Sequence, residues 1–281
     1  MTIRDLPAAR VTVRPGLRSE LQPSALDRWN ADVHAAAKEE PVDTISILEP
    51  IGADWFGDGV TAKRVSGALR AIGKKDVVVT INSPGGDYFE GLAIYNMLRD
   101  HPARVTVKIL GIAASAASVI AMAGDEIQIA RAGFVMIHNT WVVAGGDRNA
   151  LRDVADWLEP FDAAATDIYA ARTGIDPKEI AKMLDKETWL GGSDAIAKGF
   201  VDTLLPIDEI DTKAQNTSQR RPEAAAHKLD TLLARLNVPR SERRELIQAV
   251  KGGTRDATAS GMHDAAVMSE VSDLLESLKS I

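Results

Sequence analysis

Residues 104–123 have the sequence RVTVKILGIAASAASVIAMA, in which an alternating run gives way to small and apolar residues. The alternation predicts a strand over Arg104–Leu110. The apolar run over Ser115–Ala123 predicts a buried helix that follows the strand after a short turn. A strand that leads directly into a helix is the repeating unit of α/β folds.

The same alternation of strands and helices extends to both sides of this segment. Repeated strand–helix units of this length predict an α/β fold with a largely parallel sheet. The expected strands are Thr44–Leu48, Asp76–Ile81, Glu126–Ile129 and Phe134–His138, and the expected helices are Gly59–Ile72 and Asp87–Arg99.

A long helical arm is expected after the last of these strands. Apolar residues recur at helical spacing over Asn149–Thr173, although Pro160 should kink or interrupt the run. Asp176 and the proline after it are typical of a helix start, and this second helix is expected to reach Leu184. The segment Lys198–Asp202 then leads back into a short strand.

The chain divides into four parts by composition. A compact domain is expected over residues 43–206, after an N-terminal extension over residues 1–42. Residues 207–224 are polar and charged without apolar periodicity, as in a linker. Apolar residues at helical spacing return in residues 225–281, which predicts a helical C-terminal tail.

The composition excludes several classes of protein. Hydrophobic residues make up 45% of the 281 residues and charged residues 26%, as in ordinary globular proteins. A net charge of −7 argues against a nucleic-acid binder. The absence of cysteine excludes disulfides and a thiolate nucleophile. No apolar stretch approaches the roughly 18 residues of a membrane span, so we expect a cytoplasmic protein without a membrane partner.

A glycine-rich turn follows the strand that ends at Ile81. The sequence Ile81-Asn-Ser-Pro-Gly-Gly86 precedes a predicted helix, and its glycines permit close backbone approach to a ligand. Backbone N–H groups in such a turn can form an oxyanion hole. The alternative is an ordinary strand-to-helix turn, since Gly and Pro are common there.

Ser115, Ser118 and His138 are the candidate reactive side chains. Small neighbours leave room around Ser115, but a serine at a helix start is commonly an N-cap, and Ser118 could equally be a packing residue. His138 ends an apolar strand and could be a hydrogen-bonded core residue. An imidazole is nevertheless the natural base for a serine proton near neutral pH.

Taken together, three motifs over roughly residues 43–205 resemble the Clp protease proteolytic-subunit family. Asn82-Ser-Pro-Gly-Gly86 resembles its oxyanion motif, Gly111-Ile-Ala-Ala-Ser115 its nucleophile motif and Met136-Ile-His138 its base motif, in the family's order. The resemblance implies a Clp protease/crotonase-like superfold of repeated β-β-α units with a helical handle. It implies a serine endopeptidase that needs no cofactor or metal.

The resemblance also carries over individual residues. Ser115 falls on the nucleophile and His138 on the base, and the backbone N–H groups of Gly85 and Ala116 fall on the oxyanion donors. The family's third residue, an aspartate, falls on Glu187, and Asp185 is the competing candidate. The family's Met-Gly after the serine is Ala-Ala here, at residues 116–117.

Further expectations follow from the resemblance. The segments Asp54–Lys63, Ala113–Gly124 and Glu187–Trp189 resemble the phage head maturation branch, which implies capsid or scaffold substrates and a location in the host cytoplasm or a procapsid. The helical arm resembles the family's handle, and Val142–Gly146 the strand and turn of its interface. Assembly into rings follows, and an ATPase unfoldase is a possible partner.

Three alternatives remain open. One is a housekeeping Clp-type protease and another is a crotonase-type enzyme acting on acyl-CoA thioesters. The third is an inactive scaffold protein with this fold, an alternative raised by Glu187 in place of aspartate. The handle could likewise be a surface hairpin, and the tail a scaffold-like or merely variable appendage.

Overall fold

The computed structural model describes residues 18–19, 21–31, 33–35, 43–52, 59–206, 210–211, 229, 233, 243 and 245–247. The chain forms two compact units, residues 1–217 and 218–281, and every strand and helix with described bounds lies in the first. The predicted helical tail over residues 225–281 falls almost entirely outside the described residues.

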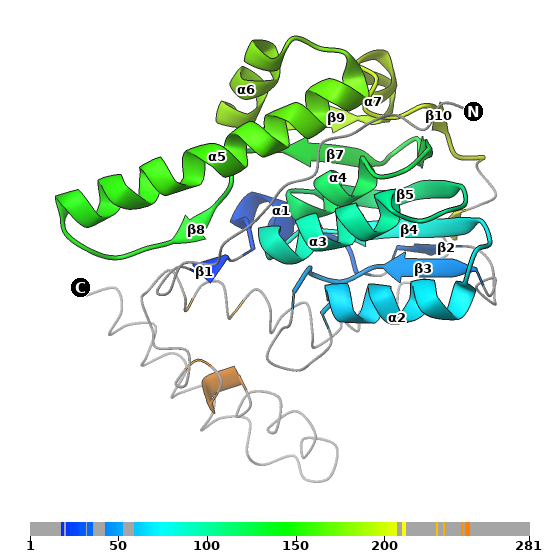
Figure 1. Ribbon diagram of the computed structural model, residues 1–281, viewed down its shortest axis with the longest axis horizontal. Coiled ribbons are helices and arrows are strands. Elements are labelled where there is room, and N and C mark those ends of the chain that lie inside the picture. Colours follow the sequence, from blue (N-terminus) through cyan, green and yellow to red (C-terminus); the bar gives the residue numbers. More distant parts are fainter. Residues whose placement is uncertain are drawn as a thin grey trace, which may run out of the picture. The chain divides into compact units, whose positions relative to one another are not determined.

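The main sheet is largely parallel, which confirms the predicted α/β fold (Figure 1). Four strands lie next to one another in the order β6-β5-β4-β3, with β10 outside β6, and β7 pairs with the end of β5. Only the β7–β9 ladder of this sheet is antiparallel. The strands are β3 (Thr44–Ile47), β4 (Val77–Ser83), β5 (Val105–Ala114), β6 (Glu126–Ile129), β7 (Phe134–Ile137), β9 (Thr188–Gly191) and β10 (Thr203–Leu204).

The five described helices between residues 62 and 185 begin and end within a few residues of the predicted bounds. The helices at Pro23–Arg28 and Gly192–Ala197 are not among the expected ones. Side-chain caps set four of the starts, and two examples are Thr61, which accepts from the Arg64 amide, and Asp87, which accepts from the amides of Phe89 and Glu90. The helices are α1 (Pro23–Arg28), α2 (Ala62–Ile72), α3 (Tyr88–Arg99), α4 (Ala116–Ala121), α5 (Arg148–Thr173), α6 (Pro177–Asp185) and α7 (Gly192–Ala197).

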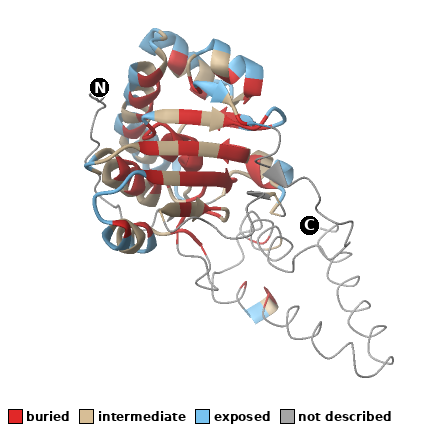
Figure 2. Ribbon diagram, turned by 90° about the vertical axis from the view of Figure 1, so that its right-hand side faces the viewer, coloured by how far each residue is buried: buried red, intermediate tan, exposed pale blue. Residues whose placement is uncertain are grey.

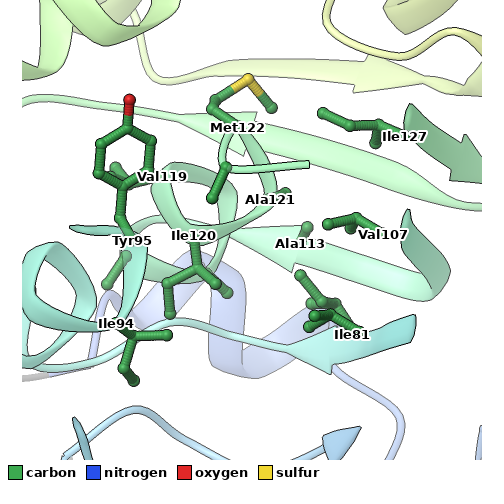
Figure 3. Close-up of a cluster of buried hydrophobic side chains, with 14 of the residues drawn as sticks. Ile81, Ile94, Tyr95, Val107, Ala113, Val119, Ile120, Ala121, Met122 and Ile127 are labelled. Atoms are coloured by element: carbon green, nitrogen blue, oxygen red, sulfur yellow. The ribbon is translucent and has the colours of Figure 1, made fainter. Parts of the chain in front are cut away.

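Helices α3 and α4 cover one face of the sheet. Ile94 and Tyr95 of α3 and Ile120 of α4 gather near Ile81 of β4 and Val107 of β5 (Figure 3). In Figure 2 the central strands are mostly buried, while the outer turns of the helices are exposed. This core explains why α4 has no charged residue and only one polar one: all six residues of that helix are buried.

Helix α1 covers part of the opposite face. Ala25 is fully buried in a small cluster with Ile112, Ala114 and Met136. Because successive strand residues point to opposite faces, these side chains of β5 point away from Ala113, which belongs to the main core. A segment from the predicted N-terminal extension therefore packs against the sheet.

The long helix α5 runs through Pro160 without interruption, so the expected kink or break is not a break. Pro160 and Asp156, whose carbonyl would otherwise accept the missing amide proton, are both exposed. Water can therefore satisfy that carbonyl. The first half of α5 projects beyond the sheet, and Leu151 on it is 46% exposed (Figure 1).

Two short antiparallel pairings join the N-terminal segment to later parts of the chain. Strand β1 (Arg18–Ser19) pairs with β8 (Val142–Val143), and β2 (His34–Ala35) pairs with β11 (Ile210–Asp211). Residues 210–211 lie in the predicted linker, so that part of it is a strand. Within the described part of the chain, no helix combines the length and apolar character that crossing a membrane requires.

Candidate active site

The candidate site lies where several strands of the main sheet end. Strands β5 and β7 are parallel neighbours with Ala114 opposite Met136, so the residues that follow them, Ser115 and His138, lie side by side. Strand β9 runs antiparallel with Thr188 opposite Ile137, which brings Glu187 to the same edge. The carboxyl ends of parallel strands are the usual ligand-binding edge of an open α/β sheet.

Ser115 sits on a sharp turn between β5 and α4. Its φ of 55° and ψ of −127° are rare for a residue other than glycine, and its amide donates to the Met136 carbonyl at 3.0 Å. The hydroxyl makes no N-cap bond. Instead Ser115 Oγ lies 2.8 Å from His138 Nε2, in hydrogen-bond contact.

Ser118 is buried, and its hydroxyl contacts two oxygen atoms. Its hydroxyl donates to the Ser115 carbonyl at 2.6 Å and lies 2.7 Å from the Tyr169 hydroxyl. These contacts support the backbone turn at Ser115. Between the two candidate serines, the geometry favours Ser115 as the reactive one.

His138 is held in a form suited to accept a proton. Burial lowers the pKa of its imidazole, and the negative charge of Glu187 opposes this by raising it, with a net decrease. The neutral imidazole therefore predominates at neutral pH. Its Nε2 faces the Ser115 hydroxyl, so the pair can exchange the hydroxyl proton.

Glu187 and Asp185 have different partners. Asp185 Oδ1 accepts from Asn139 Nδ2 at 2.8 Å, whereas Glu187 interacts electrostatically with His138. Glu187 also has a positive φ of 50°, a second unusual backbone conformation at this edge. The arrangement favours Glu187 as the acid behind the imidazole.

The carboxylate of Glu187 is held by donors on both oxygens. Gln22 Nε2 donates to Oε2 at 2.7 Å and Trp189 Nε1 to Oε1 at 3.2 Å. Partial burial works to raise the pKa of Glu187, but the nearby Ser24 hydroxyl, these two donors and His138 outweigh it, so that the pKa lies below its ordinary value. Glu187 is therefore ionised at neutral pH.

The glycine turn lies directly against the nucleophile turn. A Cβ at Gly85, whose φ is 89°, would lie 2.6 Å from both the Ala114 carbonyl oxygen and Ser115 Cβ. No other residue fits there. The Gly85 amide donates to Ser83 Oγ at 3.3 Å, and it is Gly86 that lines the pocket with Ser115 and His138. Both glycines of the turn therefore lie at the site, and Gly85 as an oxyanion donor stays a prediction.

Ala116 remains a suitable second donor. It is the first residue of α4, where amides have no partner within the helix. Tyr88, Trp141 and Tyr169 complete the pocket in front of Ser115. Among the described residues, no group of three or more His, Asp or Glu side chains is placed to hold a metal ion.

Sequence reasoning missed several contributors to this edge. Gln22 lies 165 residues before Glu187, and no motif or spacing connects the two. Trp189 enters the sequence analysis only as part of the segment that resembles the head maturation branch, and its bond to Glu187 is not expected there. The contact of Tyr169 with Ser118 depends on the packing of α5 against α4. No sequence pattern in α5 or β9 predicts that their residues contact the turn at Ser115.

An α/β sheet with a Ser–His pair at the carboxyl ends of adjacent parallel strands defines a hydrolase-type site. Residues 60–208, just over half of the chain, match the family model "Clp protease". The chain belongs to the Clp protease family, a family of serine peptidases, and has that family's fold. This assignment separates it from the crotonase group.

Individual relatives agree with the family match. The chain is 33% identical over 135 residues to ATP-dependent Clp protease proteolytic subunit 3 of Rhodococcus jostii, covering 47% of this chain and 66% of that relative. It is 30% identical over 171 residues to proteolytic subunit 1 of Streptomyces avermitilis, covering 58% and 77%. Proteolytic subunit 2 of Thermobifida fusca is 28% identical over 157 residues, covering 53% and 76%.

Proposed function

We propose that this chain is a serine endopeptidase with Ser115 as nucleophile, His138 as general base and Glu187 as the acid that supports the base. The observation that carries the proposal is the 2.8 Å contact between Ser115 Oγ and His138 Nε2. A serine hydroxyl is a weak nucleophile unless an adjacent base takes its proton.

The proposed reaction is acyl transfer through a covalent intermediate. Ser115 Oγ attacks the peptide carbonyl carbon while His138 Nε2 takes the hydroxyl proton, and the carbonyl oxygen becomes an oxyanion. The amides of Ala116 and of the glycine turn stabilise that oxyanion. Collapse breaks the C–N bond, and the imidazolium gives its proton to the leaving amine. Water, deprotonated by His138, then hydrolyses the ester and regenerates Ser115.

Glu187 acts through His138 in this scheme. Its negative charge stabilises the imidazolium that forms in each half-reaction and raises the pKa of His138 against the effect of burial. In a plot of kcat/KM against pH for the wild-type protein, the midpoint of the acid limb should lie below the ordinary histidine pKa of about 6.5. Activity rises with pH through this limb because the neutral imidazole is the active form.

Replacing Glu187 with alanine should move this limb to still lower pH, because only the lowering effect of burial remains. Loss of imidazolium stabilisation should also lower kcat by roughly 10⁴-fold. The matched control is Asp185→Ala, which removes a neighbouring carboxylate that binds Asn139. If Asp185→Ala moved the acid limb and Glu187→Ala did not, Asp185 would be the acid that supports His138.

We further propose that the chain assembles into rings and processes capsid or scaffold proteins. The resemblance of three segments to the head maturation branch supports the substrate class. The projecting helix α5 with its exposed Leu151 supports a contact between subunits. The names of the relatives favour a second candidate, a proteolytic subunit that works with an ATPase.

One cleavage experiment separates these candidates. The purified chain is incubated with unfolded casein and with candidate capsid and scaffold proteins, with and without a Clp ATPase and ATP, and the fragments are identified by mass spectrometry. Discrete cleavage of a capsid or scaffold protein without ATP is the expected result. Degradation only with the ATPase would favour the second candidate, and no cleavage of any substrate would contradict the peptidase.

A further inference from the structure

Helix α1 and its flanking residues are fixed against the candidate site. Trp29 Nε1 donates to the Asn82 carbonyl at 2.8 Å, and Asn82 Nδ2 donates back to the Asn30 carbonyl at 2.7 Å. Asn82 is buried and begins the glycine turn. Together with the buried Ala25, these bonds anchor the segment to the sheet. The family model begins only at residue 60, so this segment lies outside the match.

Gln22 lies between two anchors of this segment. Strand β1 pairs with β8 just before it, and α1 packs on the sheet just after it. Gln22 is the N-cap of α1, but its side chain makes no cap bond. Its side-chain nitrogen Nε2 instead donates to Glu187 Oε2 at 2.7 Å. Its side chain is therefore directed to the acid by backbone that is fixed on both sides.

The other carboxylate oxygen of Glu187 accepts from Trp189, a side chain that α1 also contacts. Trp189 Nε1 donates to Oε1 at 3.2 Å, and the Arg28 guanidinium lies 4.2 Å from the centre of the Trp189 ring. Arg28 belongs to α1, so the same segment contributes to both sides of the carboxylate. The Glu187 carboxylate therefore accepts one hydrogen bond from the N-terminal segment and one from β9.

We propose that Gln22 is a positioning residue that fixes the Glu187 carboxylate beside His138, so that the N-terminal segment completes the active site. This inference rests on the proposed peptidase function. A glutamate side chain has one more rotatable bond than an aspartate and loses more entropy when it is held in one orientation. A second donor offsets that disadvantage, because hydrogen bonds to a charged group are stronger than neutral ones.

The test uses Gln22→Ala in the full chain. We expect kcat to fall about tenfold with KM within about twofold, since a lost hydrogen bond to a charged group has roughly this effect. The rate of labelling by a fluorophosphonate probe should fall by a similar factor. The acid limb of the pH profile should shift to lower pH, because Glu187 is the charged group that raises the pKa of His138. A purely structural role would lower activity without moving the limb.

Two further variants sharpen the result. Gln128→Ala is the matched control, because it removes a glutamine–glutamate bond of the same 2.7 Å length, to Glu126 in β6. It should leave kcat and the limb unchanged. Gln22→Glu should reduce kcat more than Gln22→Ala, because it places a second carboxylate against Glu187. Unchanged or increased kcat in Gln22→Ala would overturn the proposal, an increase meaning that Gln22 draws Glu187 away from His138.

A titration of His138 by NMR separates this inference from the proposed function. His138→Ala assigns the resonance, and Gln22→Ala should lower the measured His138 pKa relative to wild type. Failure of the probe to label wild-type protein would count against the peptidase alone. An unchanged His138 pKa in Gln22→Ala, with wild type still labelled, would count against the role of Gln22 alone.

Discussion

Ser115→Ala is expected to abolish labelling by a fluorophosphonate probe and to lower kcat for peptide cleavage by roughly 10⁶-fold. The hydroxyl that this substitution removes is the one in contact with His138 Nε2, and the variant leaves the sharp backbone turn in place. Intact-mass spectrometry of the labelled protein measures the stoichiometry, and a peptide mapping step locates the adduct.

Two serine variants serve as comparisons. Ser66→Ala removes a hydroxyl on α2 that accepts a hydrogen bond from Arg70 Nη1 at 2.8 Å, and it should be labelled like wild type. Ser118→Ala should still be labelled at Ser115, although more slowly, because the Ser115 carbonyl loses a donor. Full labelling of Ser115→Ala, or an adduct mapped to Ser118, would contradict the assignment of the nucleophile.

His138→Ala should lower kcat by nearly as much as Ser115→Ala, because the serine hydroxyl then lacks its base. The two residues act as one unit, so the double variant should be no slower than either single variant. Steady-state kinetics on a fluorogenic peptide, with active sites counted by the probe, measures all three. Effects that multiply in the double variant would show that His138 and Ser115 act independently.

The control for this variant is His101→Ala. His101 follows α3, is only partly buried and contacts the Lys75 carbonyl at the opposite end of the strands, at 2.8 Å. Its removal should leave kcat unchanged. Circular dichroism of both histidine variants would establish that a loss in His138→Ala is not a loss of folding.

Much of the fold could be predicted because the local pattern and the tertiary structure agree. The alternation over residues 104–110 and the apolar run after Ser115 both form the elements that they predict, and Asp87 caps α3 where the sequence places a helix start. In the site, Ser115 and His138 could be singled out because three motifs occur in the order typical of one family. Their contact then follows from parallel pairing of β5 with β7.

Other features depend on atoms that a sequence pattern does not locate. The close approach of Gly85 to Ser115 depends on positive φ values in the glycine turn. Pro160 was expected to kink or interrupt α5, yet the helix continues through it. Exposure of Pro160 and Asp156 lets water satisfy the carbonyl that lacks its amide partner. The contact of Gln22 with Glu187 requires the whole domain to be folded, since the two residues are 165 positions apart.

The antiparallel pairing of β9 with β7 also has a consequence for the timing of activity. Ser115 and His138 leave the ribosome well before Glu187, which reaches them only when β9 adds to the edge of β7. A pairing between distant segments forms late, after the local strand–helix units. The newly made chain therefore carries the proposed nucleophile and base without the proposed supporting acid, and the proposed site is complete only when the whole domain has folded.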